Sequence, residues 1–269
     1  LAGPELKLAL KYNVIQRVHL MSFYDTAIRF RGWVNDLYTL RQFYKSKDNK
    51  VFEIFAKDLM NHLYGKFGQH NEKIIPCNEA MGLPDGERNY VNMESGNQYR
   101  IVVIAGQAWK STGRREACNS FPGIAAYITS AARVYLWQCM LKAGRNNVFY
   151  TDTDSLIVNR TGWRKIKDMM NDTELGLFKL EYATKKLLIR CPKDYETDKE
   201  NHIKGVTNSA TRLSANTFEQ EQWQGLRGSI AAGQTNHVTI TTVTKKLARK
   251  YNKGTVGKDG YVLPYALSS

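Results

Sequence analysis

The chain has 269 residues, and 42% of them are hydrophobic, so it can bury a substantial core and is not a disordered tail. Lysine and arginine number 39 against 25 acidic residues, which gives a formal charge of +14. This excess favours a polyanionic partner such as nucleic acid, although a basic protein without such a partner fits the charge equally well. The four cysteines stand far apart without a CxxC pair, which argues against a zinc site and suits a reducing compartment.

The first fifty residues are predicted to form a helix, a strand and a second helix. The opening helix begins near Pro4, alternating apolar residues indicate a strand from Val14 to Phe23, and residues 29–44 have helical spacing. A polar turn follows at 46–50. The sequence opens inside an element without an initiator methionine and shows no secretory signal pattern. We therefore expect a piece of an intracellular protein.

Residues 51–65 are predicted to form a helix with two different faces. The apolar side chains that should pack on the protein recur on one face and are Phe52, Phe55, Leu59 and Leu63. On the opposite face Lys57, Asn61 and Tyr64 form a narrow stripe, and Gly65 leaves room for a close approach. A cation, an amide and an aromatic ring in a row suit a nucleoside triphosphate. Taken alone, the stripe is explained more simply as a solvated helix surface.

The composition changes after this helix. Residues 70–98 are rich in glycine, proline and asparagine, which predicts an irregular, hairpin-like insertion. Arg100 to Ala105 then forms an apolar run that is typical of a strand.

The stretch from Gly123 to Leu141 is apolar enough to be mistaken for a membrane span. Arg133 lies near its middle, however, and a central arginine costs about 2.5–3.5 kcal/mol on insertion scales. We therefore predict a buried core helix over 121–142 and no membrane contact. Asn119 or Ser120 is its expected cap, and Pro122 lies in its first turn.

Residues 147–159 are predicted to form a hairpin whose turn carries Asp152 and Asp154. Residues two apart in a strand point to the same face, and two close carboxylates repel each other unless a cation lies between them. Oxygen ligands favour Mg²⁺, and a pair of such ions can clamp the attacking and leaving oxygens of a phosphoryl transfer. An ordinary polar turn is the alternative. The apolar flanks argue against it, because they make a poor place for unneutralised charge.

The last third of the chain gives weaker patterns. Residues 162–170 predict a short basic helix, and Leu175 to Tyr182 and Lys186 to Arg190 predict strands. From residue 196 to the end the composition is polar, which predicts a smaller domain. Its basic cluster KKLARKYNK, at 245–253, suits a nucleic-acid backbone or an ordinary solvated helix face.

Two segments in this order resemble the family B DNA polymerases, specifically their protein-primed branch in viruses, phages and linear plasmids. KDLMNHLYGKFG resembles the fingers-helix motif K-x3-N-S-x-YG, with His62 in place of the usual serine. YTDTDS resembles the palm motif that binds the catalytic metals. The resemblance implies that the incoming nucleotide is bound by Lys57, Asn61, Tyr64 and Gly65. It also implies that Asp154 is the main catalytic metal ligand, with Asp152 beside it.

Two weaker matches follow the same family order. TSAAR, at 129–133, resembles a palm helix motif, which implies that Thr129 and Arg133 contact DNA near the primer terminus. PKDYE resembles the K-x-Y motif, which implies that Lys193 and Tyr195 hold the primer strand near the metals.

The resemblance implies an α+β fold in the form of a partial polymerase right hand, with helical fingers, an antiparallel palm sheet with packed helices and a small C-terminal thumb. The implied parts are a palm/fingers lead-in at 1–50, the fingers helix at 51–69, the insertion at 70–98, the palm with its YTDTDS hairpin at 99–195 and a thumb-like domain at 196–269. The insertion suits either a strand-displacement subdomain or a decorated loop. The implied cofactors are two Mg²⁺ ions, with Mn²⁺ as a substitute. The implied partners are primer–template DNA, deoxynucleoside triphosphates and a terminal priming protein.

One family motif does not occur in these 269 residues. The other palm carboxylate of the family lies in a D-x2-SLYP motif upstream of the fingers helix, and neither Asp25 nor Asp36 matches it. A 3′–5′ exonuclease domain is not recognised either. We therefore expect a C-terminal polymerase fragment that is inactive alone. The alternative is a non-catalytic remnant that binds nucleic acid. An RNA-templated polymerase fits less well, because those enzymes usually present adjacent aspartates.

Overall fold

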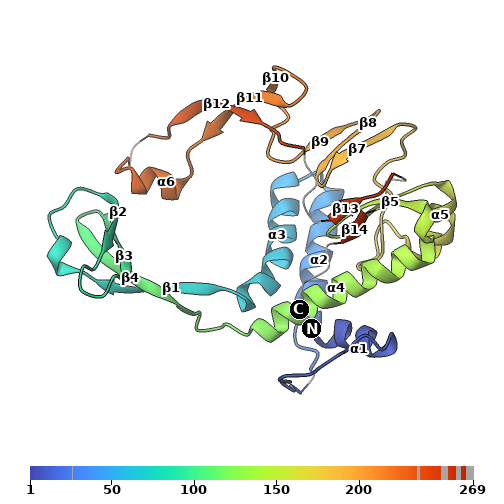
Figure 1. The fold of residues 1–269 in the computed structure, drawn as a ribbon, viewed down its shortest axis with the longest axis horizontal. Helices are drawn as coiled ribbons and strands as arrows, with labels where there is room; N and C mark the ends of the chain where they lie inside the picture. The colour runs from blue at the N-terminus through green and yellow to red at the C-terminus, as the bar shows by residue number, and fades with distance from the viewer. Residues whose placement is uncertain (26, 235–236, 250–253, 259–261, 265–269) are drawn as a thin grey trace. The chain divides into compact units, whose positions relative to one another are not determined.

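The computed structural model of the chain describes residues 1–25, 27–234, 237–249, 254–258 and 262–264. It has an α+β fold of helices and antiparallel sheets, as the sequence predicts (Figure 1). The chain divides into two compact units. The first comprises Leu1–Asn71 and Arg114–Leu180, and the second comprises Glu72–Gly113 and Glu181–Ser269.

The first unit consists mainly of helices around one hairpin. Its longer helices are α1 (Gly3–Lys11), α2 (Arg31–Ser46), α3 (Lys50–Phe67) and α4 (Pro122–Ala143). Its shorter elements are η2 (Arg145–Asn147), β5 (Val148–Asp152), β6 (Ser155–Val158), α5 (Arg160–Lys165) and η3 (Lys167–Met169). Helices α2 and α3 lie side by side, and α4 packs against α1, α3, α5 and β6 (Figure 1). Helix α4 is therefore the element that joins the parts of this unit.

The predicted helices agree with α2, α3 and α4, but two details of α4 differ from expectation. The residue before the helix is Phe121, which offers no side-chain cap, and the Ser120 hydroxyl donates instead to the Phe67 carbonyl at 3.2 Å. Only Ser130, Cys139 and Ala143 are buried along its length, so α4 has one packed side and is not a fully buried core helix. Among the described residues, no helix is long and apolar enough to cross a membrane.

Two predicted strands are wrong. The segment from Val14 to Phe23 has no strand, and its apolar side chains are open to solvent, with Leu20 89% and Phe23 84% exposed. Leu175 to Tyr182 forms only a single bridge, between Met170 and Phe178. A strand is stable only when its backbone groups pair with a neighbour, and no other described strand lies along either segment. Alternating apolar residues alone cannot supply that neighbour.

The described residues of the second unit form four small sheets. The first contains β1 (His70–Pro76), β2 (Gly86–Val91), β3 (Gln98–Ile104) and β4 (Gln107–Glu116), in the order β1-β4-β3-β2, with η1 (Asn78–Ala80) between β1 and β2. The predicted strand at 100–105 is β3. Residues 70–98 are predicted to form an irregular, hairpin-like insertion, and they contribute two strands, β1 and β2, to this sheet. Its core consists of Cys77, Ala80, Ile101, Val103 and Ala108. Ala80 of η1 belongs to this core, so η1 packs on the sheet.

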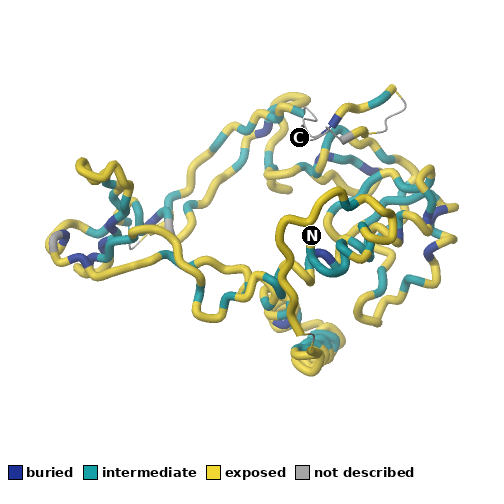
Figure 2. The backbone as a smooth tube through the Cα atoms, turned by 60° about the horizontal axis from the view of Figure 1, so that its bottom comes forward, coloured by how far each residue is buried: buried dark blue, intermediate teal, exposed yellow. Residues whose placement is uncertain are grey.

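The rest of the second unit is also built from antiparallel strands. One sheet contains β7 (Leu187–Cys191), β8 (Asp194–Thr197) and β9 (Asn201–Ile203), and another contains β10 (Thr211–Arg212), β11 (Thr217–Trp223) and β12 (Ile240–Lys246). A helix α6 (Leu226–Ala231) and a pair of strands, β13 (Gly254–Val256) and β14 (Val262–Pro264), complete it. Figure 2 shows that buried residues form short, separate stretches. Within the predicted basic cluster, residues 250–253 lie outside the described part.

Candidate functional site

The hairpin of α2 and α3 carries the predicted nucleotide-binding stripe. Asn49 caps α3, because its side chain accepts a hydrogen bond from the Phe52 N–H at 3.3 Å. Beside the connecting turn, the rings of Tyr44 and Phe52 stack with their centroids 5.0 Å apart. These contacts tie the two helices together at the start of α3 and help to fix its rotation about its own axis.

The face of α3 that packs on the protein differs from the predicted one. Ala56 is fully buried and is followed at helical spacing by the half-buried Met60 and Leu63. Phe52 and Phe55, which the sequence places on the packed face, are 49% and 58% exposed. A small alanine lets a neighbouring helix approach closely, whereas a phenylalanine at the same place would hold it away. The predicted packed face was therefore wrong for Phe52, Phe55 and Leu59 and correct for Leu63.

The predicted stripe remains on the open side of α3. Lys57 and Asn61 are exposed, and Tyr64 is 40% exposed. A Cβ atom added to Gly65 would meet nothing within 4 Å, so the helix has open space beside this glycine. His62, which replaces the usual family serine, donates from its Nδ1 to the Asp58 carbonyl at 2.7 Å. The imidazole is thus held against its own helix.

The hairpin of β5 and β6 presents both candidate carboxylates at its tip, as predicted for residues 147–159. Asp152 pairs with Ser155 across a two-residue loop, in which Thr153 adopts the left-handed conformation with φ 53°. The Asp152 carbonyl accepts from the Asp154 N–H at 2.6 Å and from the Ser155 hydroxyl at 3.0 Å. The Thr153 hydroxyl donates to the Asp152 carboxylate at 3.0 Å. Four consecutive residues therefore fix this turn by their own hydrogen bonds.

The two carboxylates have different surroundings. Asp152 is half-buried, whereas Asp154 is exposed, and the Asp154 carboxylate has no hydrogen bond or ion pair among the residues that the structure describes. The same residues contain no cluster of three or more acidic, histidine or cysteine side chains that could hold a metal. Mg²⁺ is usually held by one or two carboxylates, with substrate phosphates and water supplying the other ligands. Asp152 and Asp154 therefore fit a partial Mg²⁺ site.

Helix α4 connects the stripe to the carboxylate hairpin. At its start, the Phe121 N–H donates to the Phe67 carbonyl at 2.8 Å, which ties it to the end of α3. Towards its other end, Lys142 forms an ion pair with Asp168, and α4 packs on α5 and β6. The stripe on α3 and the carboxylate hairpin are thus both anchored on α4, a single helix of 22 residues.

Thr129 and Arg133 lie one turn apart on α4 and have different local partners. The Thr129 hydroxyl donates back to the carbonyls of Ala125 and Ala126, at 3.0 and 3.1 Å. The Arg133 side chain is 60% exposed, and its Nε donates to Glu5 at 2.6 Å. Its terminal nitrogens have no acceptor among the described residues, so they remain available to a phosphate oxygen.

Sequence reasoning missed the residue between them. Ser130 is fully buried, and its hydroxyl accepts a hydrogen bond from the Glu5 N–H at 3.0 Å. Glu5 thus holds α1 against α4 through its backbone and its side chain. A serine inside a predicted helix gives no sequence signal of a special role. The role of Ser130 is apparent only from its contact with α1.

The Glu5–Arg133 pair predicts a pH dependence of stability. The hydrogen bond from Arg133 holds the pKa of Glu5 below its ordinary value of 4.5. The pair therefore stabilises the fold above that pH, and the contribution is lost as the pH falls through the lowered pKa. We expect thermal unfolding midpoints of the wild type and Glu5→Gln to differ at pH 7 and to converge in acid. A difference that stays constant down to pH 3 would contradict this role.

The second unit carries the two remaining predicted residues on the β7–β8 hairpin. Lys193 lies in the turn with a left-handed φ of 62°, and its carbonyl accepts from the Lys204 N–H at 2.7 Å. Tyr195 lies in β8, and its ring stacks on His202 of β9 with centroids 5.1 Å apart. The structure therefore brings Lys193 and Tyr195 onto one hairpin, two residues apart.

Asp194, between these two residues, is a second residue that sequence reasoning missed. It is 3% exposed, and its carboxylate accepts from the Arg249 Nε at 2.7 Å, with the Arg190 Nη1 3.7 Å away. Arg249 also donates to the Ala215 carbonyl at 2.7 Å and to Asn216 at 2.9 Å. A buried ion pair thus ties the C-terminal segment to the hairpin. The ion pair could not be predicted from the sequence, because Asp194 and Arg249 are 55 residues apart and no local pattern links them.

Comparison with known proteins gives one consistent result. The family model for organellar and viral type B DNA polymerases matches residues 3–131. A probable DNA polymerase of Ascobolus immersus is 28% identical over 207 residues, which cover 71% of this chain and 15% of that protein. A probable DNA polymerase of Podospora anserina is 26% identical over 234 residues, 73% of this chain and 18% of that protein.

A DNA polymerase of Kluyveromyces lactis is 28% identical over 182 residues, which cover 62% of this chain and 17% of that protein. The chain thus spans less than a fifth of the length of these relatives. No solved structure matches the chain. The matched residues 3–131 include α3 with its stripe and the first part of α4, and the relatives agree in their description. Over residues 3–131 the chain is similar to the type B DNA polymerases of organelles and viruses.

Proposed function

We propose that the chain supplies the nucleotide-binding fingers helix and part of the metal-binding palm of a DNA-directed DNA polymerase. The observation that carries this proposal is the stripe of Lys57, Asn61 and Tyr64, which stays open to solvent while the Ala56 side of the same helix packs. In this proposal α2 and α3 are fingers, α4 with the β5–β6 hairpin belongs to the palm, and residues 196–269 form the thumb. A terminal priming protein is a proposed partner on the family resemblance alone.

Asp154 and Asp152 are the residues proposed to hold the divalent metal, Mg²⁺ or Mn²⁺. When bound, two such ions activate the primer 3′ hydroxyl and stabilise the charge that develops on the transferred phosphate. The open carboxylate of Asp154 and the fixed turn around Thr153 support this assignment. Mg²⁺ demands oxygen ligands, and these two residues leave positions for nucleotide phosphates and for a further carboxylate.

The other candidate residues position substrates. Lys57 is proposed to neutralise the triphosphate, and Tyr64 and Asn61 to shape the nucleotide pocket beside the open flank of Gly65. On the DNA side, Thr129 and Arg133 are proposed to contact the primer end from α4. Lys193 and Tyr195 are proposed to hold the primer strand. The free terminal nitrogens of Arg133 support its role, since arginine binds phosphate oxygens in pairs.

Replacing Lys57 by alanine is expected to raise the KM for deoxynucleotides by roughly 10- to 100-fold, the cost of a charged hydrogen bond to phosphate. Steady-state primer extension by a polymerase that contains this sequence measures the effect. Lys66→Ala is the matched control, because Lys66 lies on the opposite side of α3 and bonds to Gln69. Equal KM values for the wild type and Lys57→Ala would remove Lys57 from the nucleotide site.

A non-catalytic nucleic-acid-binding role is the second candidate. It is favoured by the charge of +14 and by the described residues' lack of a metal cluster of three or more ligands. Primer extension separates the two. A polymerase that joins this sequence to a segment with the D-x2-SLYP carboxylate should extend a primer, whereas the 269-residue chain alone should not. Binding of DNA without extension in the longer protein would favour the second candidate.

A further inference from the structure

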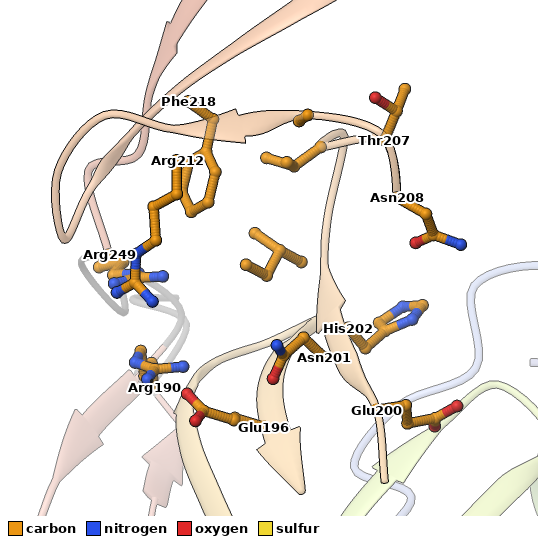
Figure 3. Close-up of a pocket in the computed structure, with 13 residues that line it drawn as sticks. Arg190, Glu196, Glu200, Asn201, His202, Thr207, Asn208, Arg212, Phe218 and Arg249 are labelled. Atoms are coloured by element: carbon orange, nitrogen blue, oxygen red, sulfur yellow. Dashed lines mark hydrogen bonds and ion pairs between the residues drawn. The ribbon is translucent and has the colours of Figure 1, made fainter.

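A polar pocket of about 510 Å³ lies within the second unit (Figure 3). Its walls come from the sheet of β7, β8 and β9, from the loop that follows β9, and from β10 and β11. Ile203, Val206 and Phe218 give it an apolar wall. Charged side chains line the pocket beside these apolar ones, and the Arg212 guanidinium lies 5.9 Å from the centre of the Phe218 ring, so the pocket combines two kinds of surface.

Three arginines gather on one side of this pocket: Arg190, Arg212 and Arg249 (Figure 3). Arg190 forms an ion pair with Glu196 at 2.5 Å, and Arg249 forms one with Asp194 at 2.7 Å. Arg212 donates to backbone carbonyls of 214 and 215 and has no carboxylate partner among the described residues. This side of the pocket therefore carries one positive charge more than its neighbours neutralise.

The positive field extends across this wall. The pKa of Glu196 lies below its ordinary value, chiefly because Arg190 donates to it, and the charge of Arg212 adds to the effect. The other carboxylate of the lining belongs to Glu200, which accepts from the Tyr182 hydroxyl at 2.5 Å and lies apart from the arginines in Figure 3. An anion beside Arg212 would thus lie closer to the positive charges of the arginines than to the negative charge of Glu200.

One donor on this wall lacks a partner. The Arg249 Nη2 is buried and forms no hydrogen bond within the described part of the chain, although the Nε and Nη1 of the same guanidinium are bonded. Buried donors in folded proteins nearly always have an acceptor, so an unpaired one indicates a missing water, ion or ligand. Arg249 is one of the residues that line the pocket, so an anion bound in the pocket would lie beside this guanidinium.

We propose that this pocket binds one backbone phosphate of a nucleic-acid strand, with Arg212 and Arg249 as its donors. Guanidinium groups match the geometry of phosphate oxygens and are weakly hydrated, so they suit a partly buried phosphate site. The apolar wall around Phe218 packs against the adjoining sugar. The choice of a nucleic-acid phosphate rests on the proposed polymerase function, whereas the anion site itself rests on the arginines.

The pocket also borders the hairpin proposed to hold the primer. His202 lines the pocket, and the ring of Tyr195 stacks on it. A strand that contacts Lys193 and Tyr195 with its 3′ end would place one of its other phosphates at the arginines. The pocket is then a second binding point for the primer strand, and the two binding points together fix the register of that strand relative to the hairpin.

The test uses the 269-residue chain and a fluorescent primer–template duplex. Arg212→Ala is the informative variant, because it removes the arginine without a carboxylate partner and leaves the Asp194–Arg249 pair intact. We expect its affinity to fall about tenfold and the slope of log K against log salt to fall by about 1. Arg88→Ala is the matched control, since Arg88 lies in the same unit outside the pocket and also donates to a backbone carbonyl, at 2.9 Å.

A set of primers, each with one neutral methylphosphonate, locates the phosphate. One position should weaken binding of the wild type and of Arg88→Ala but not of Arg212→Ala. If no position behaves in this way while the wild type binds DNA, the pocket proposal is overturned and the polymerase assignment stands.

If the wild type binds no DNA, the nucleic-acid assignment fails, and titration with inorganic phosphate tests the anion site separately. NMR shifts of the Arg212 and Arg249 Nε–H signals on addition of phosphate would retain an anion site. If these signals do not shift, the proposal of an anion site is overturned as well.

Discussion

Replacing Asp154 by alanine is expected to lower primer extension at least about a thousandfold, equivalent to about 4 kcal/mol of transition-state stabilisation. The carboxylate is exposed at the tip of the β5–β6 hairpin and has no partner among the described residues, so its removal leaves the fold intact. The loss would therefore report on metal binding. Single-turnover extension by a polymerase that contains this sequence, with saturating nucleotide and Mg²⁺, measures the chemical step directly.

Asp168→Asn is the matched control for this prediction. Asp168 is an exposed carboxylate of the same unit, paired with Lys142 at the far end of α4 from the stripe. Its replacement should leave the extension rate within about twofold. An Asp154→Ala enzyme that extends primers at the wild-type rate would end the proposal that this hairpin binds the catalytic metal.

The helices were predictable from sequence because their signals are local. The predicted boundaries of 51–65 differ from those of α3 by only a residue or two at each end. The packed face was not predictable, because it depends on the neighbour. The Phe52 ring stacks on Tyr44 and stays half exposed, whereas the small Ala56 is the fully buried residue of α3. A count of apolar residues favours large side chains, whereas close helix packing favours a small one.

The strands depended on partners that the sequence pattern does not contain. The YTDTDS hairpin was predicted correctly because both strands and their two-residue turn lie within one short segment. Val14 to Phe23 has similar apolar residues but no neighbouring strand among those described, and it is irregular and largely exposed. Strand prediction therefore succeeded where pairing is local and failed where it is not.

The candidate site divides in the same way. Residues at fixed spacing within one element, such as Lys57 and Asn61, follow from the motif. Contacts between distant segments do not, and these include the bond from Glu5 to Ser130 and the pair of Asp194 and Arg249. Such pairs join residues that are far apart in sequence, so only the fold brings them together.

Replacing Asp194 by alanine is expected to destabilise the second unit by about 3–5 kcal/mol, because it leaves Arg249 without its buried counter-ion. The Asp194 and Arg249 side chains are 4% and 13% exposed, so solvent cannot replace the lost carboxylate. Urea unfolding of the 269-residue chain, followed by tryptophan fluorescence, measures the change in the free energy of unfolding. Trp109 and Trp223 lie in the second unit, and the unfolding transition of this unit should move to a lower urea concentration.

Two comparisons separate the ion pair from a general effect of losing a side chain. Asp198→Ala removes an exposed carboxylate four residues away, and its unfolding midpoint should stay near that of the wild type. The double variant Asp194→Ala/Arg249→Ala removes both charges together. It should be less destabilised than the sum of the single variants, because no Arg249 charge then remains buried alone. Exact additivity would show that Asp194 and Arg249 act independently, and the hairpin that carries Lys193 and Tyr195 would need another anchor.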